Sequence, residues 1–362
     1  MISTKEALAT IYDAVIIGAG PAGSSAAKVL DERGLDYILV DREKFPRNKP
    51  CAGVLSPKIR SLIDIPPGIT ERPLRGYRVF SPAGRIVESS FPEPGFIVQR
   101  TEFDAFLVNS LATKPVREKV TQIIDKGGFL EVRNDHWSCK ARYIIGADGV
   151  NSVVRRYCGI PTNQVAAAAQ CVVRLPADEI DQRVGNWFEV YYTQHHGYGW
   201  ISPMKDSLRI GIGIITGHLT ENIQAVLDRF MESSIVREKW DGGEIVKREA
   251  ASIPMSGPLD RLTRPRILLC GDAGGFVYPG TGEGIFYAIK TGRIAAQLIS
   301  RLHKEGDLDA DLLEEFYSHE LENNGLFALR DVDFTEKNLS STENAEKYVC
   351  KLAHVVRARS VS

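Results

Sequence analysis

The sequence predicts an α/β composite fold, in which a discontinuous nucleotide-binding domain with a parallel sheet carries an inserted antiparallel β-sheet domain and is followed by C-terminal helices. Three observations support this expectation. A short apolar strand, a glycine-rich turn and an Ala-rich helix follow one another over 12–33. Strands followed by Gly/Asp turns recur at 142–149 and 267–275, and the stretch 165–217 between them is mainly strand-like. The nucleotide-type segments are therefore split along the chain by a β-rich insertion.

The composition is that of an ordinary globular protein, with room for one large composite domain or two smaller ones. The chain has 362 residues, of which 43% are hydrophobic and 25% charged, and its formal net charge is -1. A near-neutral balance argues against a general nucleic-acid binder, which needs a basic surface field. We therefore expect no nucleic-acid partner.

The cysteines and the hydropathy pattern bear on the cellular compartment. The six cysteines form no C-x-x-C pair, so we expect reduced thiols and no metal site. No stretch approaches the roughly 18 apolar residues that cross a bilayer. These features predict a cytoplasmic protein.

The N-terminal elements are predicted from short periodic runs. Tyr12–Ile17 is apolar and suits a buried parallel strand, and Ser24–Arg33 is an Ala-rich helix. Tyr37–Val40 is a second strand that ends at Asp41, and the polar, Pro-rich stretch 42–58 is typical of a loop.

Later elements follow the same rules. Between 76 and 99 we expect short strands with turns at 81–84 and 92–95, and Thr101 is the expected N-cap of a helix over 101–112. A hairpin is expected over 129–140. The remaining predicted strands are 142–145, 169–175, 187–193, 199–203, 208–215 and 267–270, and the remaining helices are 221–233, 282–303, 309–323 and 343–356.

The glycine-rich turn is the first motif that carries chemistry. Gly18, Gly20 and Gly23 form a G-x-G-x-x-G between a strand and a helix. Glycines there permit a tight turn and the close approach of a pyrophosphate, which the helix N-terminus favours through its N–H groups and dipole. Asp41, at the end of the next strand, can accept hydrogen bonds from a ribose. The pattern predicts a dinucleotide site, and a glycine-rich turn without a ligand is the alternative.

Two more glycine motifs follow later in the chain. Residues 146–155 (G-A-D-G-V-N-S-V-V-R) and 271–284 (G-D-A-G-G-F, then P-G-T-G-E-G) each come after a strand. With the first motif, they resemble the FAD-binding set of flavoproteins built like p-hydroxybenzoate hydroxylase, which implies a Rossmann-like FAD-binding domain. The resemblance implies cofactor contacts at Gly18, Gly20, Pro21, Ala22, Gly23, Asp41, Arg42, Cys51, Ala52, Gly53, Arg100, Val120, Asp148, Gly149, Gly271, Asp272, Gly282, Gly284 and Ile285.

Particular roles come with this resemblance. The first motif would hold the pyrophosphate, and Asp41 would bind the adenosine ribose. Arg100, which opens an R-x-x-F-D element, would face the phosphate or ribityl side, and a backbone contact at Val120 would meet adenine. Asp272 would bind the ribityl chain. The helix that opens at Gly282–Gly284 would direct its N-terminal dipole at negative charge near flavin N1 and O2.

Two shorter segments narrow the family. Lys49–Gly53 (K-P-C-A-G) and Tyr198–Pro203 (Y-G-W-I-S-P) resemble elements of the geranylgeranyl reductases, as does the stretch 276–285. Ser202 stands where that family usually has Phe, and Met204 stands where Lys is common. These departures bear on the fit of a lipid chain and on the choice of head group.

The resemblance implies saturation of C=C bonds in a prenyl chain of an isoprenoid diphosphate or a membrane lipid, by hydride from N5 of reduced FAD. A proton must reach the other alkene carbon, so a donor must lie close. Cys51 is one candidate, and a buried structural thiol is the alternative. Tyr198 and Trp200 would line the pocket, with Tyr198 as a second candidate acid. Aromatic packing on a sheet face explains both residues equally well.

The implied partners are a prenylated small molecule or lipid and an electron donor. Only one dinucleotide fingerprint is present, so the donor is expected to be a visiting NAD(P)H or a ferredoxin-like protein. A lipid tail implies peripheral contact with the inner face of a membrane. A flavin-dependent monooxygenase or halogenase of the same fold is the alternative enzyme, and a flavin-binding sensor without turnover is a third hypothesis.

The expected domain boundaries follow the motifs. We assign 1–75, 99–160 and 262–308 to the FAD-binding domain, 76–98 and 161–261 to the substrate β-sheet domain, and 309–362 to a C-terminal helical segment.

Overall fold

The computed structural model describes residues 10–162, 164–192, 196–305, 310–330 and 334–361. It divides into two compact units, each with its own sheet and core. Unit 1 comprises Met1–Arg47, Phe103–Asn163 and Ser256–Asp331, and unit 2 comprises Asn48–Glu102, Gln164–Met255 and Val332–Ser362. Among the described residues, no helix combines the length and apolarity needed to cross a bilayer.

Unit 1 is built on a mainly parallel sheet with the strand order β15-β16-β9-β1-β2-β6. Its central strands are nearly continuous apolar runs, because helices cover both faces of such a sheet. The first half of β9 also pairs with β8, which pairs in turn with β7. The strands are β1 (Ile11–Ile17), β2 (Tyr37–Asp41), β6 (Val116–Arg117), β7 (Gln122–Asp125), β8 (Leu130–Arg133), β9 (Ser138–Gly146), β15 (Thr263–Arg264) and β16 (Ile267–Leu269).

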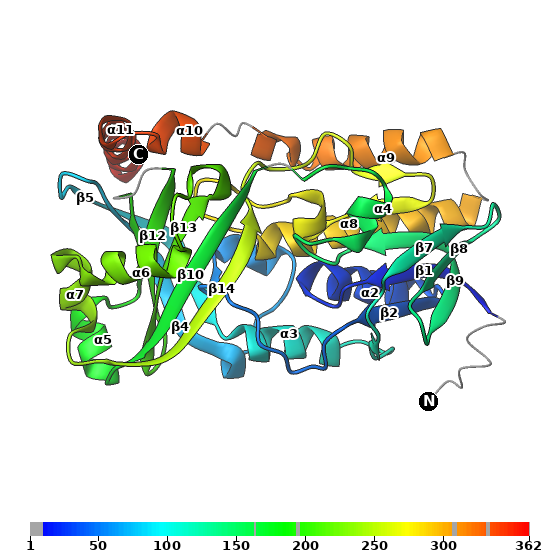
Figure 1. Ribbon diagram of the computed structural model, residues 1–362, viewed down its shortest axis with the longest axis horizontal. Coiled ribbons are helices and arrows are strands. Elements are labelled where there is room, and N and C mark those ends of the chain that lie inside the picture. The colour runs from blue at the N-terminus through cyan, green and yellow to red at the C-terminus, as the bar shows by residue number, and fades with distance from the viewer. Residues whose placement is uncertain (1–9, 163, 193–195, 306–309, 331–333, 362) are drawn as a thin grey trace. The chain divides into compact units, whose positions relative to one another are not determined.

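The longest helix of unit 1 packs against two others. The helices are α2 (Pro21–Arg33), α4 (Val153–Tyr157), α8 (Ile285–Glu305) and α9 (Ala310–Asn323), while α3 (Arg100–Asn109) begins in unit 2 and ends in unit 1. α8 contacts both α2 and α9 (Figure 1). The contact with α2 requires glycine at 292, because a Cβ there would lie 2.1 Å from the carbonyl oxygen of Ala22.

Unit 2 is built on a second sheet with the order β14-β10-β13-β12-β11-β4-β5-β3. Neighbouring strands are antiparallel, except that β11 and β4 run parallel. The strands are β3 (Val54–Leu55), β4 (Thr70–Phe80), β5 (Ile86–Val98), β10 (Val165–Arg174), β11 (Trp187–Tyr191), β12 (Gly197–Pro203), β13 (Ser207–Ile215) and β14 (Glu244–Pro254). The helices are α5 (Ala177–Arg183), α6 (Ile223–Glu232), α7 (Ser234–Trp240), α10 (Phe334–Leu339) and α11 (Thr342–Val361).

The pleat of the second sheet separates two apolar clusters, because successive side chains of a strand point to opposite faces. On β12, Ile201 belongs to the cluster that contains Phe230 of α6. Tyr198 and Trp200 belong to the other cluster, which contains Val349 of α11. The aromatic residues singled out in the sequence therefore share the face that α11 covers.

The predicted fold class is confirmed, with some differences among the elements. The stretch 76–99 holds two long strands rather than several short ones, and the turn expected at 92–95 lies within β5. The second strand of the predicted hairpin and the strand at 142–145 are a single strand, β9. β14 was not predicted, because it is an edge strand whose first half is exposed and charged and so lacks apolar alternation.

The units are divided differently from the predicted domains. Residues 48–75 lie in unit 2, because β3 pairs with β5 and β4 begins at Thr70. The predicted C-terminal segment 309–362 is divided between the units. α9 belongs to unit 1, where the Tyr317 hydroxyl donates to the carbonyl of Leu269 at 2.9 Å, whereas α10 and α11 belong to unit 2.

Candidate active site

The three glycine motifs meet at one edge of the sheet of unit 1. β16, β9 and β1 are parallel neighbours, and each motif directly follows one of them. Backbone hydrogen bonds join the motifs: Cys270 N–H donates to Gly146 O at 3.0 Å, and Ala147 N–H donates to Ile17 O at 2.8 Å. Segments far apart in the sequence thus form one surface at the carboxyl ends of the strands, where such folds bind ligands.

Two glycines of the first motif are required by close contacts. Gly18 has a φ of +100°, and a Cβ on it would lie 2.3 Å from the carbonyl oxygen of Ala147. A Cβ on Gly23 would lie 1.7 Å from the carbonyl oxygen of Gly18. The turn that leads into α2 is therefore bare backbone at the N-terminus of a helix, which fits a pyrophosphate.

Asp41 fixes the same turn. Its Oδ2 accepts a hydrogen bond from Ala19 N–H at 2.7 Å, and its Oδ1 accepts one from Glu43 N–H at 2.8 Å. Each carboxylate oxygen has a second lone pair, so the group can still accept a hydrogen bond from a ribose hydroxyl. Arg42, beside it, is exposed and lies 3.6 Å from Glu43.

Sequence reasoning did not assign Arg47 to this site. Its Nη2 lies 3.0 Å from Oδ2 of Asp104, the fully buried acid of the R-x-x-F-D element. The same nitrogen would lie 3.3 Å from a Cβ on Gly20. Its Nε is buried and has no hydrogen-bond partner within the described ranges. A guanidinium held beside the glycine turn suits a phosphate. The only signal in the sequence was an Arg in a basic loop.

The second motif presents one oxygen that the structure does not satisfy. Oδ2 of Asp148 accepts hydrogen bonds from Val153 N–H at 2.6 Å and Val154 N–H at 3.2 Å, at the start of α4. Oδ1 is buried and has no hydrogen-bond partner in the part of the chain that the structure describes. Burial raises the pKa of Asp148, against the opposing effects of the Ser152 hydroxyl and of these N–H groups. Gly149 follows with a φ of +78°, as a tight turn requires.

The third motif brings Asp272 to the N-terminus of α8. Its Oδ1 would lie 3.5 Å from a Cβ on Gly284, which directly precedes Ile285, the first residue of the helix. Gly271 N–H donates to Thr291 Oγ1 of α8 at 3.0 Å, which ties the motif to that helix. A carboxylate and a helix N-terminus together suit the hydroxyl-rich and electron-accepting parts of FAD.

The other predicted cofactor residues are less simply placed. Val120 is buried in the core of unit 1, so a contact with the cofactor there would rest on its backbone. Arg100 and the segment Cys51–Gly53 belong to unit 2. Their contacts with the cofactor remain predictions.

Tyr198 and Trp200 lie together on one face of the sheet of unit 2. Their ring centroids are 6.3 Å apart, and each residue is 7% exposed. Trp200 lies over its register partner Gly211, where a Cβ would come within 2.2 Å of the indole. The indole Nε1 is buried and has no hydrogen-bond partner among the described residues. Burial raises the pKa of Tyr198, so this phenol keeps its proton at neutral pH.

The Cys51–Gly53 loop meets the same face. Ala52 packs against the cluster that contains Tyr198 and Trp200, and its carbonyl accepts the Ser202 hydroxyl at 2.8 Å. The Cys51 sulfur accepts a hydrogen bond from Gly53 N–H at 3.4 Å. The loop that carries Cys51 therefore packs, through Ala52, against the apolar cluster that holds Tyr198 and Trp200.

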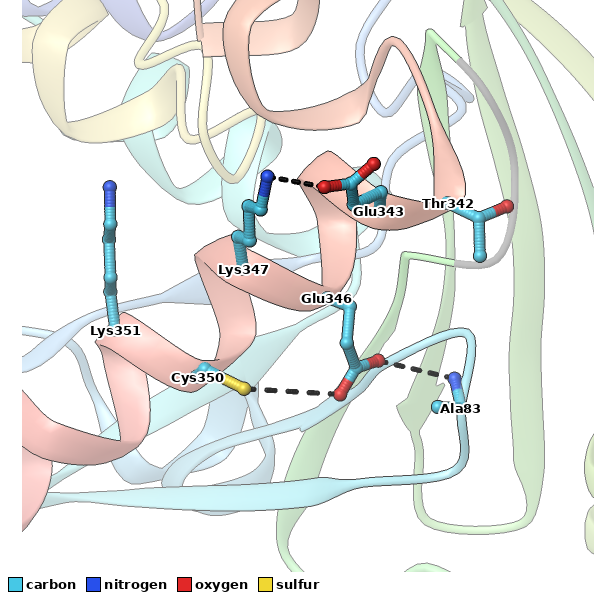
Figure 2. Close-up of a pocket in the computed structure, with 7 residues that line it drawn as sticks. All are labelled: Ala83, Thr342, Glu343, Glu346, Lys347, Cys350 and Lys351. Atoms are coloured by element: carbon cyan, nitrogen blue, oxygen red, sulfur yellow. Dashed lines mark hydrogen bonds and ion pairs between the residues drawn. The ribbon is translucent and has the colours of Figure 1, made fainter.

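A groove elsewhere on unit 2 has no part in this arrangement. It has a volume of about 680 Å³ and opens between α11 and the turn that joins β4 to β5 (Figure 2). Most of its charged groups are paired: Glu346 accepts hydrogen bonds from Ala83 N–H and Arg85 Nε, both at 3.3 Å, and Lys347 pairs with Glu343 at 2.5 Å. None of the predicted site residues lines the groove.

The thiols differ in accessibility, which predicts their reactivity. All six cysteines are free, but only Cys51 and Cys350 are partly exposed. Burial raises the pKa of Cys139 to about 12 and that of Cys158 to about 11, so the reactive thiolate is scarce at pH 8. We expect iodoacetamide at pH 8 to modify two thiols in the native protein and all six after denaturation. Peptide mass spectrometry would identify the sites, and a third thiol reacting at a similar rate would contradict the burial described here.

Comparison with known proteins shows the family to which the chain belongs. Residues 11–64 and 126–323 match the FAD binding domain family. The digeranylgeranylglycerophospholipid reductase of Methanosarcina acetivorans is 31% identical over 330 residues, which cover 85% of this chain and 79% of that protein. The geranylgeranyl diphosphate reductase of Rhodobacter capsulatus is 32% identical over 315 residues, which cover 82% and 76%.

Solved structures share the fold. A geranylgeranyl bacteriochlorophyll reductase-like protein from Thermoplasma acidophilum matches with a TM-score of 0.75 at 21% identity, over 96% of this chain and 98% of that one. A flavin-dependent brominase matches with a TM-score of 0.73 at 18% identity, over 96% and 93%. The chain binds FAD as an FAD-dependent oxidoreductase, and it belongs to the geranylgeranyl reductase family of flavoproteins.

Proposed function

We propose that the protein saturates C=C bonds in a prenyl chain of geranylgeranyl type, carried by an isoprenoid diphosphate or a membrane lipid. The observation that carries this proposal is the apolar face of unit 2, where the thiol-bearing Cys51–Gly53 loop adjoins Tyr198 and Trp200. A hydrocarbon chain gains binding free energy mainly by leaving water for such a surface. The two related reductases are named for substrates with chains of this type.

The reaction adds a hydride to one carbon of the C=C bond and a proton to the other, and the double bond becomes a single bond. FAD, when bound and reduced, supplies the hydride. The protein must orient the alkene, exclude water and deliver the proton. Cys51 and the neutral phenol of Tyr198 are the proposed proton donors. Trp200, whose indole contacts Gly211, is proposed to shape the surface that the chain contacts.

The test uses the FAD-loaded protein, reduced without oxygen. Geranylgeranyl diphosphate and a geranylgeranylated glycerophospholipid are added separately, and products are read by mass spectrometry. We expect a gain of one H₂ per double bond, with flavin reoxidised in step, and the better substrate identifies the head group. No saturated product from either lipid would contradict the proposal. Oxygen consumption with an oxygenated or halogenated aromatic product would instead support the alternative monooxygenase or halogenase.

Two matched variants test which residue donates the proton. Cys51→Ser should slow saturation by about a hundredfold if the thiol is the donor, since general acid catalysis contributes on that order. Cys350→Ser, at the other partly exposed thiol, should leave the rate unchanged. A normal rate for Cys51→Ser would move the assignment to Tyr198.

The electron donor and the membrane are proposed partners. We propose that NAD(P)H or a ferredoxin-like protein reduces the bound flavin, which stopped-flow reduction with each donor would test. We also propose reversible contact with a membrane surface. Failure to co-sediment with anionic liposomes at low salt would exclude that contact.

A further inference from the structure

Side chains from two neighbouring strands of unit 2 bind the Cys51–Gly53 loop. Arg209 Nη1 donates to the carbonyl oxygen of Cys51 at 2.9 Å, and the Ser202 hydroxyl donates to that of Ala52 at 2.8 Å. Ser202 on β12 and Arg209 on β13 are register partners. Two consecutive carbonyls of the loop are thus bound by a cross-strand pair of side chains.

The loop lies directly against the sheet at this point. Gly53 has a φ of +75°, and a Cβ on it would lie 2.1 Å from the carbonyl oxygen of Val98 and 2.9 Å from Arg209 Nη1. Val98 N–H donates to Gly53 O at 2.9 Å, and at the other end of the loop Asn48 donates to Glu249 at 2.7 Å. The backbone of Cys51 is therefore held between anchored positions.

Arg209 and Ser202, whose side chains bind the loop, are polar residues in a buried environment. Arg209 is 8% exposed, and burial lowers its pKa. Its guanidinium donates to neutral oxygens, those of Cys51 and of the Gln99 side chain. Ser202 is completely buried. Burying a charge and a hydroxyl costs free energy unless both groups form hydrogen bonds. The carbonyl groups of the loop therefore stabilise the buried Arg209 and Ser202, and these two side chains in turn hold the loop in place.

We propose that Ser202 and Arg209 are positioning residues, which hold the Cys51–Gly53 loop against β12 and β13 and so set where the Cys51 thiol stands for the reaction. The part that concerns the reaction rests on the proposed prenyl saturation. The part that concerns the loop does not, since it depends only on contacts within unit 2.

Thiol labelling tests the loop without any substrate. Cys51 of the FAD-loaded protein is labelled with N-ethylmaleimide between pH 6 and 9, and its rate is divided by that of Cys350 in the same sample. Ser202→Ala should raise this ratio about fivefold, the factor that one lost hydrogen bond represents. Arg209→Met should raise it about tenfold or more, because a charged donor is lost. Arg209→Lys keeps the charge on a single donor nitrogen and should fall between wild type and Arg209→Met.

Matched controls separate a released loop from a damaged fold. Arg72→Met removes an equally buried arginine of unit 2 that donates to the carbonyl of Met204, and it should leave the Cys51 ratio unchanged. Cys171, buried on β10, should stay unlabelled in every informative variant. If Arg209→Met exposes Cys171, that variant has a damaged fold and is set aside. The proposal is then tested by Ser202→Ala, which removes a single oxygen atom and so disturbs the fold least. Wild-type labelling in Ser202→Ala and Arg209→Lys would overturn the proposal.

Turnover tests the second part. Ser202→Ala and Arg209→Lys should lower kcat for prenyl saturation by about fivefold while KM stays near the wild-type value, since one anchoring hydrogen bond is lost or weakened. Faster labelling with unchanged kcat would show that the loop is held but that its position does not matter. If the wild-type protein saturates no prenyl substrate, the proposed function fails, while the labelling result still decides whether the pair holds the loop.

Discussion

Replacing Gly23 by alanine is expected to weaken FAD binding severely. The new Cβ would lie 1.7 Å from the carbonyl oxygen of Gly18 and 2.9 Å from its carbonyl carbon, both of which are backbone atoms. Gly18 cannot move aside easily, since a Cβ on it would already lie 2.3 Å from Ala147 O. The turn must therefore open where the pyrophosphate is expected. We expect affinity for FAD to fall by at least about a hundredfold, the factor that corresponds to an overpacking cost near 3 kcal/mol.

Alanine substitutions at two other glycines serve as controls for the loss of FAD affinity. Gly128→Ala, in the same unit, meets no atom within 4 Å and should bind FAD normally. Gly20→Ala meets only Nη2 of Arg47 at 3.3 Å, so it should weaken binding less than Gly23→Ala. Affinity is measured by flavin fluorescence titration of the apoprotein, and circular dichroism reports whether each variant folds. Gly23→Ala binding FAD with wild-type affinity would falsify this account of the turn.

Replacing Glu189 by glutamine should cause the largest loss of stability in unit 2. This carboxylate on β11 is completely buried, and three donors share it. Its Oε1 accepts hydrogen bonds from Arg78 Nη1 at 2.9 Å and Lys239 Nζ at 3.1 Å, and its Oε2 accepts one from the Tyr191 hydroxyl at 2.6 Å. The amide leaves the largely buried Lys239 without its counter-charge, and it leaves Arg78 with only the half-exposed carboxylate of Glu88. We expect the free energy of unfolding to fall by about 3–5 kcal/mol.

Glu88→Gln is the matched control. Glu88 binds the same Arg78, through Nε at 2.8 Å, but its side chain is 47% exposed. An exposed ion pair contributes about 0–1 kcal/mol, so this variant should unfold near the wild-type urea midpoint. Similar midpoints for both variants would mean that the buried carboxylate does not hold the network together.

The sequence was most informative where glycine and a strand end occur together. Gly18, Gly23 and Gly271 could be predicted as parts of one site because their three motifs together resemble the FAD-binding set of known flavoproteins, and parallel strands do bring these motifs to one edge. Arg47 could not, since its pairing with Asp104 depends on the path of the loop after β2. The register that places Ser202 opposite Arg209 is likewise a property of the assembled sheet.

For the C-terminal helices too, the sequence predicted the elements but not the core against which each one packs. The sequence predicted helices at 309–323 and 343–356, and α9 and α11 form there. Spacing identifies an apolar face, but not the core against which that face packs. α9 packs on unit 1 and α11 on unit 2, so the single C-terminal segment that we expected is not one unit.

During translation, the first strands of unit 1 leave the ribosome long before the segments that complete their sheet. α2 ends at Arg33, whereas its packing partner α8 begins at Ile285. At typical rates of synthesis this interval lasts roughly ten to fifty seconds. Until β9 and α8 are made, β1 has an open edge and α2 an uncovered apolar face. The nascent chain should therefore depend on chaperones over this period, and a truncation that ends before α8 should aggregate rather than fold.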